Sequence, residues 1–297
     1  MKNKFRILYA FLGLFLLFSA CTPTVNEMGT LIDKSQLKFS ITPDVAHPNR
    51  IILKSLTPGV TPMWVTPIGR SIRANDTITI AFPGNYKFVY GVESAGGFVQ
   101  ADTFKITIST IDQQYVSGPL WTALSGGFGN EKTWYLDLDA NAKSKFFAGP
   151  EFFYGTFDNW DIVTNGAKAP SGADSWNWCP DYPGNSWLMP AMNYGSMTFN
   201  LKNGAYVSVT NNAIPALGTK SGTYLLDEAA HTLKLTDAGI IHDKGTDGMV
   251  KDWGSIRILS MTADHMQLAA LRDPVLSGQG ACQLVYNFVS KAYYDAH

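Results

Sequence analysis

Residues 197–209 read MTFNLKNGAYVSV. Two runs of alternating apolar and polar residues flank the pair Asn203-Gly204, which favours a type I′ turn and is a strong short-range signal for a β-hairpin. The alternation turns one face of each strand towards a core and the other towards solvent. This stretch therefore predicts two antiparallel strands joined by a tight turn.

The same pattern continues towards the end of the chain. Further alternating or nearly alternating runs cover residues 222–226, 232–236, 255–261, 266–271 and 283–289. The links 227–230 and 262–265 are short, and short links favour sequential antiparallel neighbours. We therefore predict a meander that closes into a barrel or splits into a sandwich, with a jelly roll as the alternative. No run predicts a helix longer than two turns.

Short β-type runs also fill the N-terminal part of the chain. They are separated by Pro, Gly and Asn clusters, as in a small sandwich, and cover residues 37–41, 50–54, 62–65, 77–82, 86–90 and 104–108. Residues 111–119 mark a boundary between two parts. The predicted domains are a spacer sandwich over 36–112 and a larger β-rich domain over 113–297, so the expected fold class is all-β.

The first 21 residues have the pattern of a secretory signal. Lys2, Lys4 and Arg6 precede an apolar run that is too short to span a bilayer as a stable helix, and small residues precede Cys21. Residues 22–35 are polar and lack periodicity, so they form the predicted tether. We expect residues 1–21 to be a signal peptide and the mature chain to face an extracytoplasmic space.

Charge and composition argue against nucleic acid as a partner. Without the three basic residues of the signal, 20 Lys and Arg stand against 24 Asp and Glu, a formal net charge of −4. No basic block or stripe appears. Only 16% of the residues are charged whereas 13% are aromatic. This balance favours a partner that is met through a flat, uncharged surface.

The mature chain keeps two cysteines beyond its first residue. Cys179 and Cys282 fit no zinc motif in their spacing. They form either one disulfide, as an oxidising compartment allows, or two buried free thiols.

Aromatic residues are concentrated in one part of the second domain. Six of the eight tryptophans lie between Trp121 and Trp187. Residues 176–187 carry three of them with Pro and Gly and without alternation, which indicates a loop whose rings must meet either a core or a ligand. A second cluster, 152–161, sets aromatic rings beside Asp and Asn. Trp134 lies in a strand pattern and is a predicted core residue. For Trp253, just before a strand, the sequence favours a core position and a ligand-facing position equally.

Aromatic rings beside carboxylates and amides suit carbohydrate. The C–H face of a pyranose stacks on an indole or phenol ring, and its hydroxyls need polar partners at the rim. The predicted ligand-binding residues are the aromatic Trp160, Trp176, Trp178, Trp187, Tyr154 and Tyr182, and the polar Asp158, Asn159, Asp161, Asp181 and Asn193. The alternative is that these rings fold onto the sheet and plug one end of a barrel.

The sequence gives less support to a catalytic site or a metal site than to a sugar-binding site. A glycoside hydrolase needs two carboxylates about 5–10 Å apart, and Glu151 with Asp158 or Asp161 is the conceivable pair. Residues 137–141 begin like a calcium loop, but Ala142 and Ala148 replace its Gly and its closing Glu. We therefore predict no catalytic residue, no metal site and no cofactor, with calcium as the alternative. A third class is an adhesive surface protein that binds another protein.

Three stretches resemble known families. Residues 17–21, LFSAC, resemble a bacterial lipobox, in which Cys21 is lipidated; a plain signal peptide is the alternative. Residues 82–86, 95–97 and 104–108 resemble the last strands of a PKD-type immunoglobulin-like module, although WVTPIG at 64–69 replaces its usual Trp-x-Phe-Gly-Asp-Gly turn. The pattern from Gly222 to Leu268 resembles lipocalin-like modules of Bacteroidetes-type lipoproteins.

The whole layout resembles the surface glycan-binding lipoproteins of Bacteroidetes polysaccharide-utilisation systems. In these, the terminal domain captures an oligosaccharide and the earlier module is a spacer. The resemblance implies a lipid anchor at Cys21 in the outer membrane, on its extracellular face, because Thr22 rather than Asp follows the cysteine. It also implies a polysaccharide or oligosaccharide ligand, β-glucan-like, and an outer-membrane glycan importer complex as a further partner.

Overall fold

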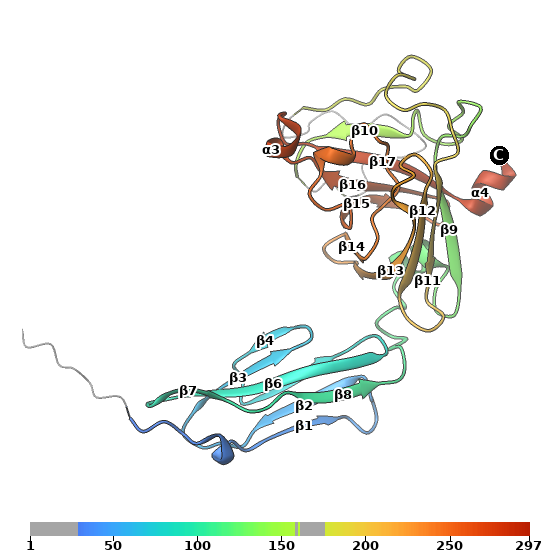
Figure 1. Cartoon of the computed structure of the whole chain (residues 1–297). Helices are drawn as coiled ribbons and strands as arrows, with labels where there is room; N and C mark the ends of the chain where they lie inside the picture. Colours follow the sequence, from blue (N-terminus) through green and yellow to red (C-terminus); the bar gives the residue numbers. More distant parts are fainter. Residues whose placement is uncertain (1–28, 158–159, 161–175) are drawn as a thin grey trace, which may run out of the picture. The chain divides into compact units, whose positions relative to one another are not determined.

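The chain forms two compact units, one built around strands β1–β8 and the other around β9–β17 (Figure 1). The computed structural model describes residues 29–157, 160 and 176–297. Both units consist of β-sheets with short helices, so the expected all-β class is confirmed. Cys21 and residues 22–28 of the predicted tether lie outside the described residues. The predicted domain limits, 36–112 and 113–297, stay predictions.

The N-terminal unit contains two sheets, with orders β1-β2-β5 and β4-β3-β6-β7, and β8 beside β6. Phe39 on the first sheet packs 4.7 Å from the ring of Tyr90 on the second, and Tyr90 lies 4.5 Å from the fully buried Trp64. The two sheets therefore enclose an aromatic core. The elements are η1 (Lys34–Gln36), β1 (Phe39–Pro43), β2 (Arg50–Ser55), β3 (Thr61–Thr66), β4 (Gly69–Ser71), β5 (Asn75–Thr79), β6 (Gly84–Ser94), β7 (Gly97–Gln100) and β8 (Phe104–Ile108).

The C-terminal unit is a closed antiparallel barrel of eight strands. From β11 to β17 each strand pairs with the next in the chain, and β9 joins β11 to β17 and closes the ring. This order confirms the predicted meander and is not that of a jelly roll, which contains two Greek keys. The strands are β9 (Glu131–Leu136), β11 (Gly195–Asn200), β12 (Tyr206–Asn211), β13 (Gly218–Asp227), β14 (Thr232–Thr236), β15 (Ser255–Met261), β16 (His265–Leu271) and β17 (Gln283–Ser290).

The hairpin predicted over residues 197–209 is present as β11 and β12, but the predicted turn type is wrong. A type I′ turn needs positive φ at both central residues, and neither Asn203 nor Gly204 has one. The backbone of Leu201 pairs with Asn130 instead, donating its N–H at 2.9 Å. This bond extends the β9 side of the sheet beyond β11, so the link becomes residues 201–205 and no tight turn forms.

Helices are short throughout the described residues, as expected. Besides η1, they are α2 (Pro119–Ser125), η2 (Asp247–Met249), α3 (Pro274–Ser277) and α4 (Lys291–Ala296). The carboxylate of Glu228 accepts the N–H of Leu120 at 2.6 Å, at the N-terminus of α2. In the part of the chain that the structure describes, no helix has the length and apolar character needed to cross a membrane.

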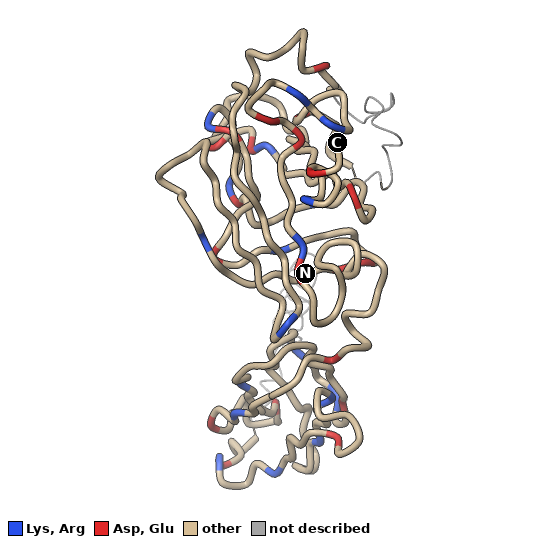
Figure 2. The backbone as a smooth tube through the Cα atoms, turned by 90° about the vertical axis from the view of Figure 1, so that its right-hand side faces the viewer, with Lys and Arg blue, Asp and Glu red and all other residues tan. Residues whose placement is uncertain are grey.

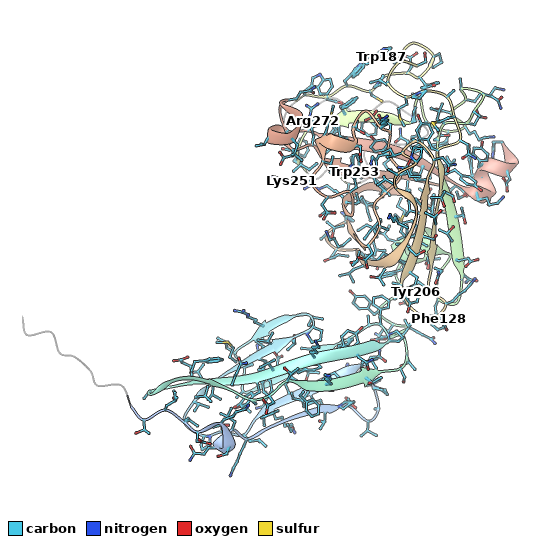
Figure 3. All side chains as sticks on the ribbon, in the orientation of Figure 1. Phe128, Trp187, Tyr206, Lys251, Trp253 and Arg272 are labelled. Atoms are coloured by element: carbon cyan, nitrogen blue, oxygen red, sulfur yellow. The ribbon has the colours of Figure 1, made fainter. Side chains whose placement is uncertain are left out.

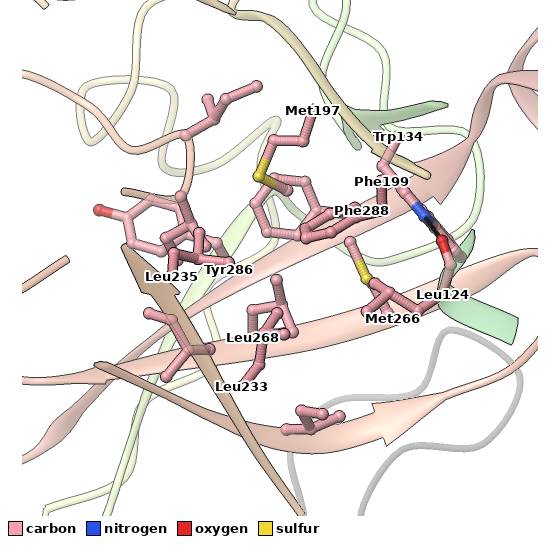
Figure 4. Close-up of a cluster of buried hydrophobic side chains, with 14 of the residues drawn as sticks. Leu124, Trp134, Met197, Phe199, Leu233, Leu235, Met266, Leu268, Tyr286 and Phe288 are labelled. Atoms are coloured by element: carbon pink, nitrogen blue, oxygen red, sulfur yellow. Dashed lines mark hydrogen bonds between the residues drawn. The ribbon is translucent and has the colours of Figure 1, made fainter. Parts of the chain in front are cut away.

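Large side chains fill the barrel interior (Figure 4). Trp134, Phe199 and Phe288 are completely buried. The indole Nε1–H of Trp134 donates to the carbonyl oxygen of Leu124 at 2.8 Å, which ties β9 to the end of α2. Trp134 is therefore a core residue, as predicted from its strand pattern. Figure 2 shows Lys, Arg, Asp and Glu scattered over the described residues without a basic stripe.

One edge of β17 is divided between two strands. Residues from Phe288 to Ser290 pair with β9, whereas residues from Gln283 to Tyr286 pair with β10 (Glu151–Tyr154). The change occurs at Asn287, whose carbonyl accepts the N–H of Asp137 and whose N–H donates to Pro150, both at 2.8 Å. Its side-chain amide donates to Gly149 and accepts from Gln267. Asn287 thus closes the barrel through β9 and diverts β10 to the outside.

Antiparallel pairing places the longest loops of the barrel at one end and shorter turns at the other. Links 201–205, 228–231 and 262–264 lie at one end, and 155–194, 237–254 and 272–282 lie at the other. Figure 3 shows this difference, with Tyr206 and Phe128 at the turn end and Trp187 and Arg272 at the loop end. The predicted aromatic loop therefore belongs to the end where a ligand site has room to form.

We expect Asn287→Ala to weaken the barrel strongly. The change leaves the side chain of Gln267 and the carbonyl of Gly149 without their buried partner, which should lower the free energy of unfolding by about 2–4 kcal/mol. Urea unfolding measures this difference. Asn203→Ala, in an exposed link, is the control and should change the free energy by less than about 0.5 kcal/mol. Equal values for the two variants would show that closure does not depend on Asn287.

Candidate functional site

The aromatic loop begins at the end of β10, where buried polar side chains hold its backbone. The side-chain amide of Gln283 donates to the carbonyls of Gly155 and Phe157 at 2.8 and 2.9 Å. Arg257 donates to the carbonyl of Thr156 at 2.8 Å. The loop re-enters the barrel at Gly195, which has φ of +100° and would place a Cβ only 2.0 Å from the Thr210 carbonyl. Both junctions are therefore fixed by the barrel.

The outer edge of β10 supports the tryptophan segment directly. Phe153 and Trp178 exchange two backbone hydrogen bonds of 2.9 Å in an antiparallel bridge. Their rings lie side by side, with centroids 5.6 Å apart and planes at 12°. Residues opposite each other across such a bridge point to the same face. A rigid strand thus orients the centre of the aromatic segment.

Four rings form a continuous cluster, here called the aromatic platform: Phe153, Trp176, Trp178 and Trp187. Trp176 lies 5.0 Å from Phe153 and 5.9 Å from Trp178, and Trp187 lies 6.0 Å from Trp178 with planes at 25°. Trp176 is 49% exposed and Trp187 is 71% exposed. Phe153 is buried and Trp178 is half-buried. The cluster therefore has a packed centre and two open indoles.

Arg272 supports the platform from the neighbouring loop. Its guanidinium carbon lies 5.8 Å from the ring centroid of Trp176. The side chain is 6% exposed, and it donates to Gly280 and Gln279 at 2.9 and 2.5 Å. A cation over an indole contributes about 0.5–2 kcal/mol, more when it is shielded from water. Trp176 is therefore held between Phe153 and an immobilised Arg272.

The underside of the loop is packed against the barrel. Tyr182 is 5% exposed, and its hydroxyl donates to the carbonyl of Met189 at 2.8 Å. Its backbone N–H donates to Ala148 at 3.0 Å. Tyr154 is completely buried in a small cluster with Phe152. The prediction that Tyr182 and Tyr154 face a ligand is therefore wrong, because both rings support the site from within the fold.

Of the predicted polar residues, the structure describes Asp181 and Asn193, and neither has a recorded contact with a platform ring. Asp181 is exposed, and its carboxylate accepts the N–H of Gly184 at 3.3 Å within the loop. Asn193 is exposed and lines a different cavity, of about 310 Å³, with Tyr135 and Tyr294. Asp158, Asn159 and Asp161 lie outside the described residues, so their proposed contacts with sugar stay predictions.

Two further tryptophans take up separate positions. Trp160 stacks on His231 with centroids 4.0 Å apart, beside the link between β13 and β14. Trp253 stacks on His242 at 3.7 Å and donates its Nε1–H to the carbonyl of Asp247. It also lines a cavity of about 230 Å³ at the loop end. The ring contacts of these two residues are thus formed outside the platform.

Carboxylates that the sequence suggested for chemistry have structural partners or are buried. Asp137 accepts the backbone N–H groups of Lys145, Phe146 and Phe147, and Asp139 accepts those of Asn141 and Lys143. These bonds fold the loop that resembled a calcium site. Glu151 is only 3% exposed, and the residues proposed to pair with it, Asp158 and Asp161, lie outside the described residues. Cys282 is buried and Cys179 is half-buried, and no disulfide joins the two.

The sequence did not predict the platform residue Phe153 or Arg272, which supports the platform. Phe153 lay within the aromatic cluster 152–161, but nothing in the sequence distinguished it from its neighbours as the partner of Trp178. Arg272 carries no local signal, because its role depends on a loop that is distant in the chain. The platform as a whole gives no family assignment: no family model matches the chain, and no curated protein is detectably similar to it in sequence.

We expect Arg272→Ala to loosen Trp176. Loss of the cation–ring contact and of two hydrogen bonds should lower the free energy of unfolding by about 1–3 kcal/mol. The freed indole should also become more accessible to iodide, which quenches tryptophan fluorescence. Arg70→Ala, at an exposed site on β4, is the matched control and should leave quenching unchanged. Unchanged quenching in Arg272→Ala would mean that Phe153 alone positions Trp176.

Proposed function

We propose that this protein binds polysaccharide or oligosaccharide chains without cleaving them, through the aromatic platform, while a lipid on Cys21 anchors it to the extracellular face of the outer membrane. Capture of a glycan for uptake is the role that fits this arrangement. An outer-membrane importer complex is the partner that would receive the glycan. The proposal concerns a binding protein, with neither a metal nor an organic cofactor.

One observation supports the proposal above the others. Two indoles are open to solvent, Trp176 at 49% and Trp187 at 71%, on a base that is fixed by strand pairing and by Arg272. Large apolar groups that stay exposed in a cluster are typical of binding surfaces. A plug would bury these rings, as the fold does with Tyr182 and Tyr154. The open indoles therefore favour a partner above the loop.

The chemistry of the platform suits sugar. The C–H face of a pyranose can stack on an indole, and each such contact contributes about 0.5–1.5 kcal/mol by analogy with aromatic pairs. Because the rings are already fixed, little conformational entropy is lost on binding. The exposed carboxylate of Asp181, on the same loop, is available to accept hydroxyl groups. The platform thus offers stacking surface, and the loop that carries it also carries an exposed carboxylate.

The arrangement of the rings favours a chain over a single sugar. Trp176, Trp178 and Trp187 follow one another at centroid distances of 5.9 and 6.0 Å. Successive rings can contact successive units of an extended glycan, and their contributions then combine. A row of aromatic rings of this kind favours an extended, β-glucan-like ligand.

We expect Trp187→Ala and Trp176→Ala each to weaken glycan binding about tenfold or more, which corresponds to about 1.4 kcal/mol. Trp187→Ala should leave the melting temperature nearly unchanged, since the ring is mostly exposed. Phe128→Ala is the matched control, because Phe128 is 45% exposed at the opposite end of the barrel (Figure 3). Equal affinities for wild type, Trp187→Ala and Trp176→Ala would remove the platform from the binding site.

Titration calorimetry of the purified protein against a panel of polysaccharides tests the function itself. We expect heat of binding with at least one glucan and no release of reducing sugar during prolonged incubation. Release of reducing sugar would instead identify a glycoside hydrolase. Absence of heat with every glycan would favour an adhesive protein that binds a protein partner.

A further inference from the structure

A buried carboxyl group lies directly beneath residues 176–189, here called the platform loop. Glu151 is on β10 opposite Tyr286, two residues before the platform residue Phe153. It is 3% exposed, and its Oε1 atom has no hydrogen-bond partner among the residues that the structure describes. Buried polar atoms are nearly always paired, so an unpaired carboxyl oxygen at this position needs an explanation.

A small cavity separates this carboxyl from the loop. Its volume is about 10 Å³, close to the minimum that holds one water molecule. Glu151 and Pro150 form one wall. The other walls are all residues of the platform loop: Pro180, Tyr182, Asn185, Leu188 and Met189. A change in the charge or hydration of this carboxyl group therefore acts first on the loop that carries Trp176, Trp178 and Trp187.

The surroundings of Glu151 disfavour a negative charge. Among the described residues, Glu151 forms no ion pair. The titratable groups that act on it or respond to its charge are acidic or neutral: Asp243, Tyr286, Tyr194, Cys282 and, across the cavity, Tyr182. The carboxyl group of Asp243 accepts the hydroxyls of Tyr286 and Thr246 at 2.8 and 2.5 Å and the N–H of Gly245.

We propose that Glu151 is the positioning residue of the platform: its protonated carboxyl group keeps the loop packed on β10, and its ionisation releases the loop and weakens ligand binding. The binding half of this statement rests on the proposed function. An ionised carboxylate has about four acceptor positions to satisfy, and a cavity for one water cannot supply them. Hydration therefore requires the opposite wall of the cavity, the platform loop, to move away.

The direction of the pH effect follows from the burial of the group. Burial, and then the charge of Asp243, raise the pKa of Glu151 well above its ordinary value of 4.5, while the neighbouring hydroxyl of Tyr286 opposes the rise. The folded protein thus keeps this proton at pH values where the unfolded chain has lost it. Stability contributed by the protonated form is full below the unfolded pKa and declines as pH rises towards the folded pKa.

The first test needs no ligand. Iodide quenching of tryptophan fluorescence, measured from mildly acidic to alkaline pH, should increase as pH rises in the wild type. Glu151→Gln, which has nearly the shape of the protonated acid, should show no increase. Asp243→Asn removes the nearest negative charge and should move the wild-type transition to lower pH. Parallel profiles for wild type and Glu151→Gln would overturn the proposal.

The second test uses the glucan that gives the strongest heat of binding. If only the protonated form holds the loop in place, the apparent Kd rises by about tenfold for each pH unit above the transition, and Glu151→Gln removes this rise. An affinity that is independent of pH in the wild type would overturn the positioning role. A pH-dependent quenching change in a protein that binds no glycan would support the role of Glu151 and contradict the proposed function instead.

Discussion

The divided edge of β17 is the constraint on which the rest of the C-terminal unit depends. A strand has two edges, and one edge of β17 is occupied by β16. The other edge of β17 pairs with β10 along its first residues and with β9 along its last, and the switch between the two partners occurs at Asn287. To close the barrel, β9 pairs with only part of that edge. The rest of the edge pairs with β10, whose own outer edge is not used by the barrel strands. That free edge is where Trp178 pairs with Phe153.

This geometry explains how exposed tryptophans can be held rigidly. Loops are usually more mobile than the elements they connect, and a mobile indole loses entropy when it binds. Here the loop is tied to a strand at its centre, to Gln283 and Arg257 at its start, and to Arg272 at its side. Tyr182 and Glu151 support it from below. The two outer indoles can therefore stay open without becoming mobile, which suits a preformed binding surface.

Much of this fold can be predicted from local patterns, because alternation and short links determine a meander almost by themselves. Strands β11 to β17, the buried Trp134 and the loop nature of residues 176–187 all follow from such patterns. The type I′ turn at Asn203 fails because Leu201 pairs with Asn130, a contact between distant residues. The prediction that Tyr154 and Tyr182 face a ligand fails because composition does not tell which face of a strand or loop a ring occupies. Arg272 and Glu151 depend on tertiary contacts alone.

The central claim is that a sugar chain lies on the open indoles of the platform. The most direct test follows the indole N–H signals of the eight tryptophans by NMR while a β-glucan oligosaccharide is added. We predict that the signals of Trp176 and Trp187 shift in a saturable manner, while that of Trp134, which is buried against Leu124, stays in place. Saturable binding that leaves the Trp176 and Trp187 signals unmoved would contradict the account.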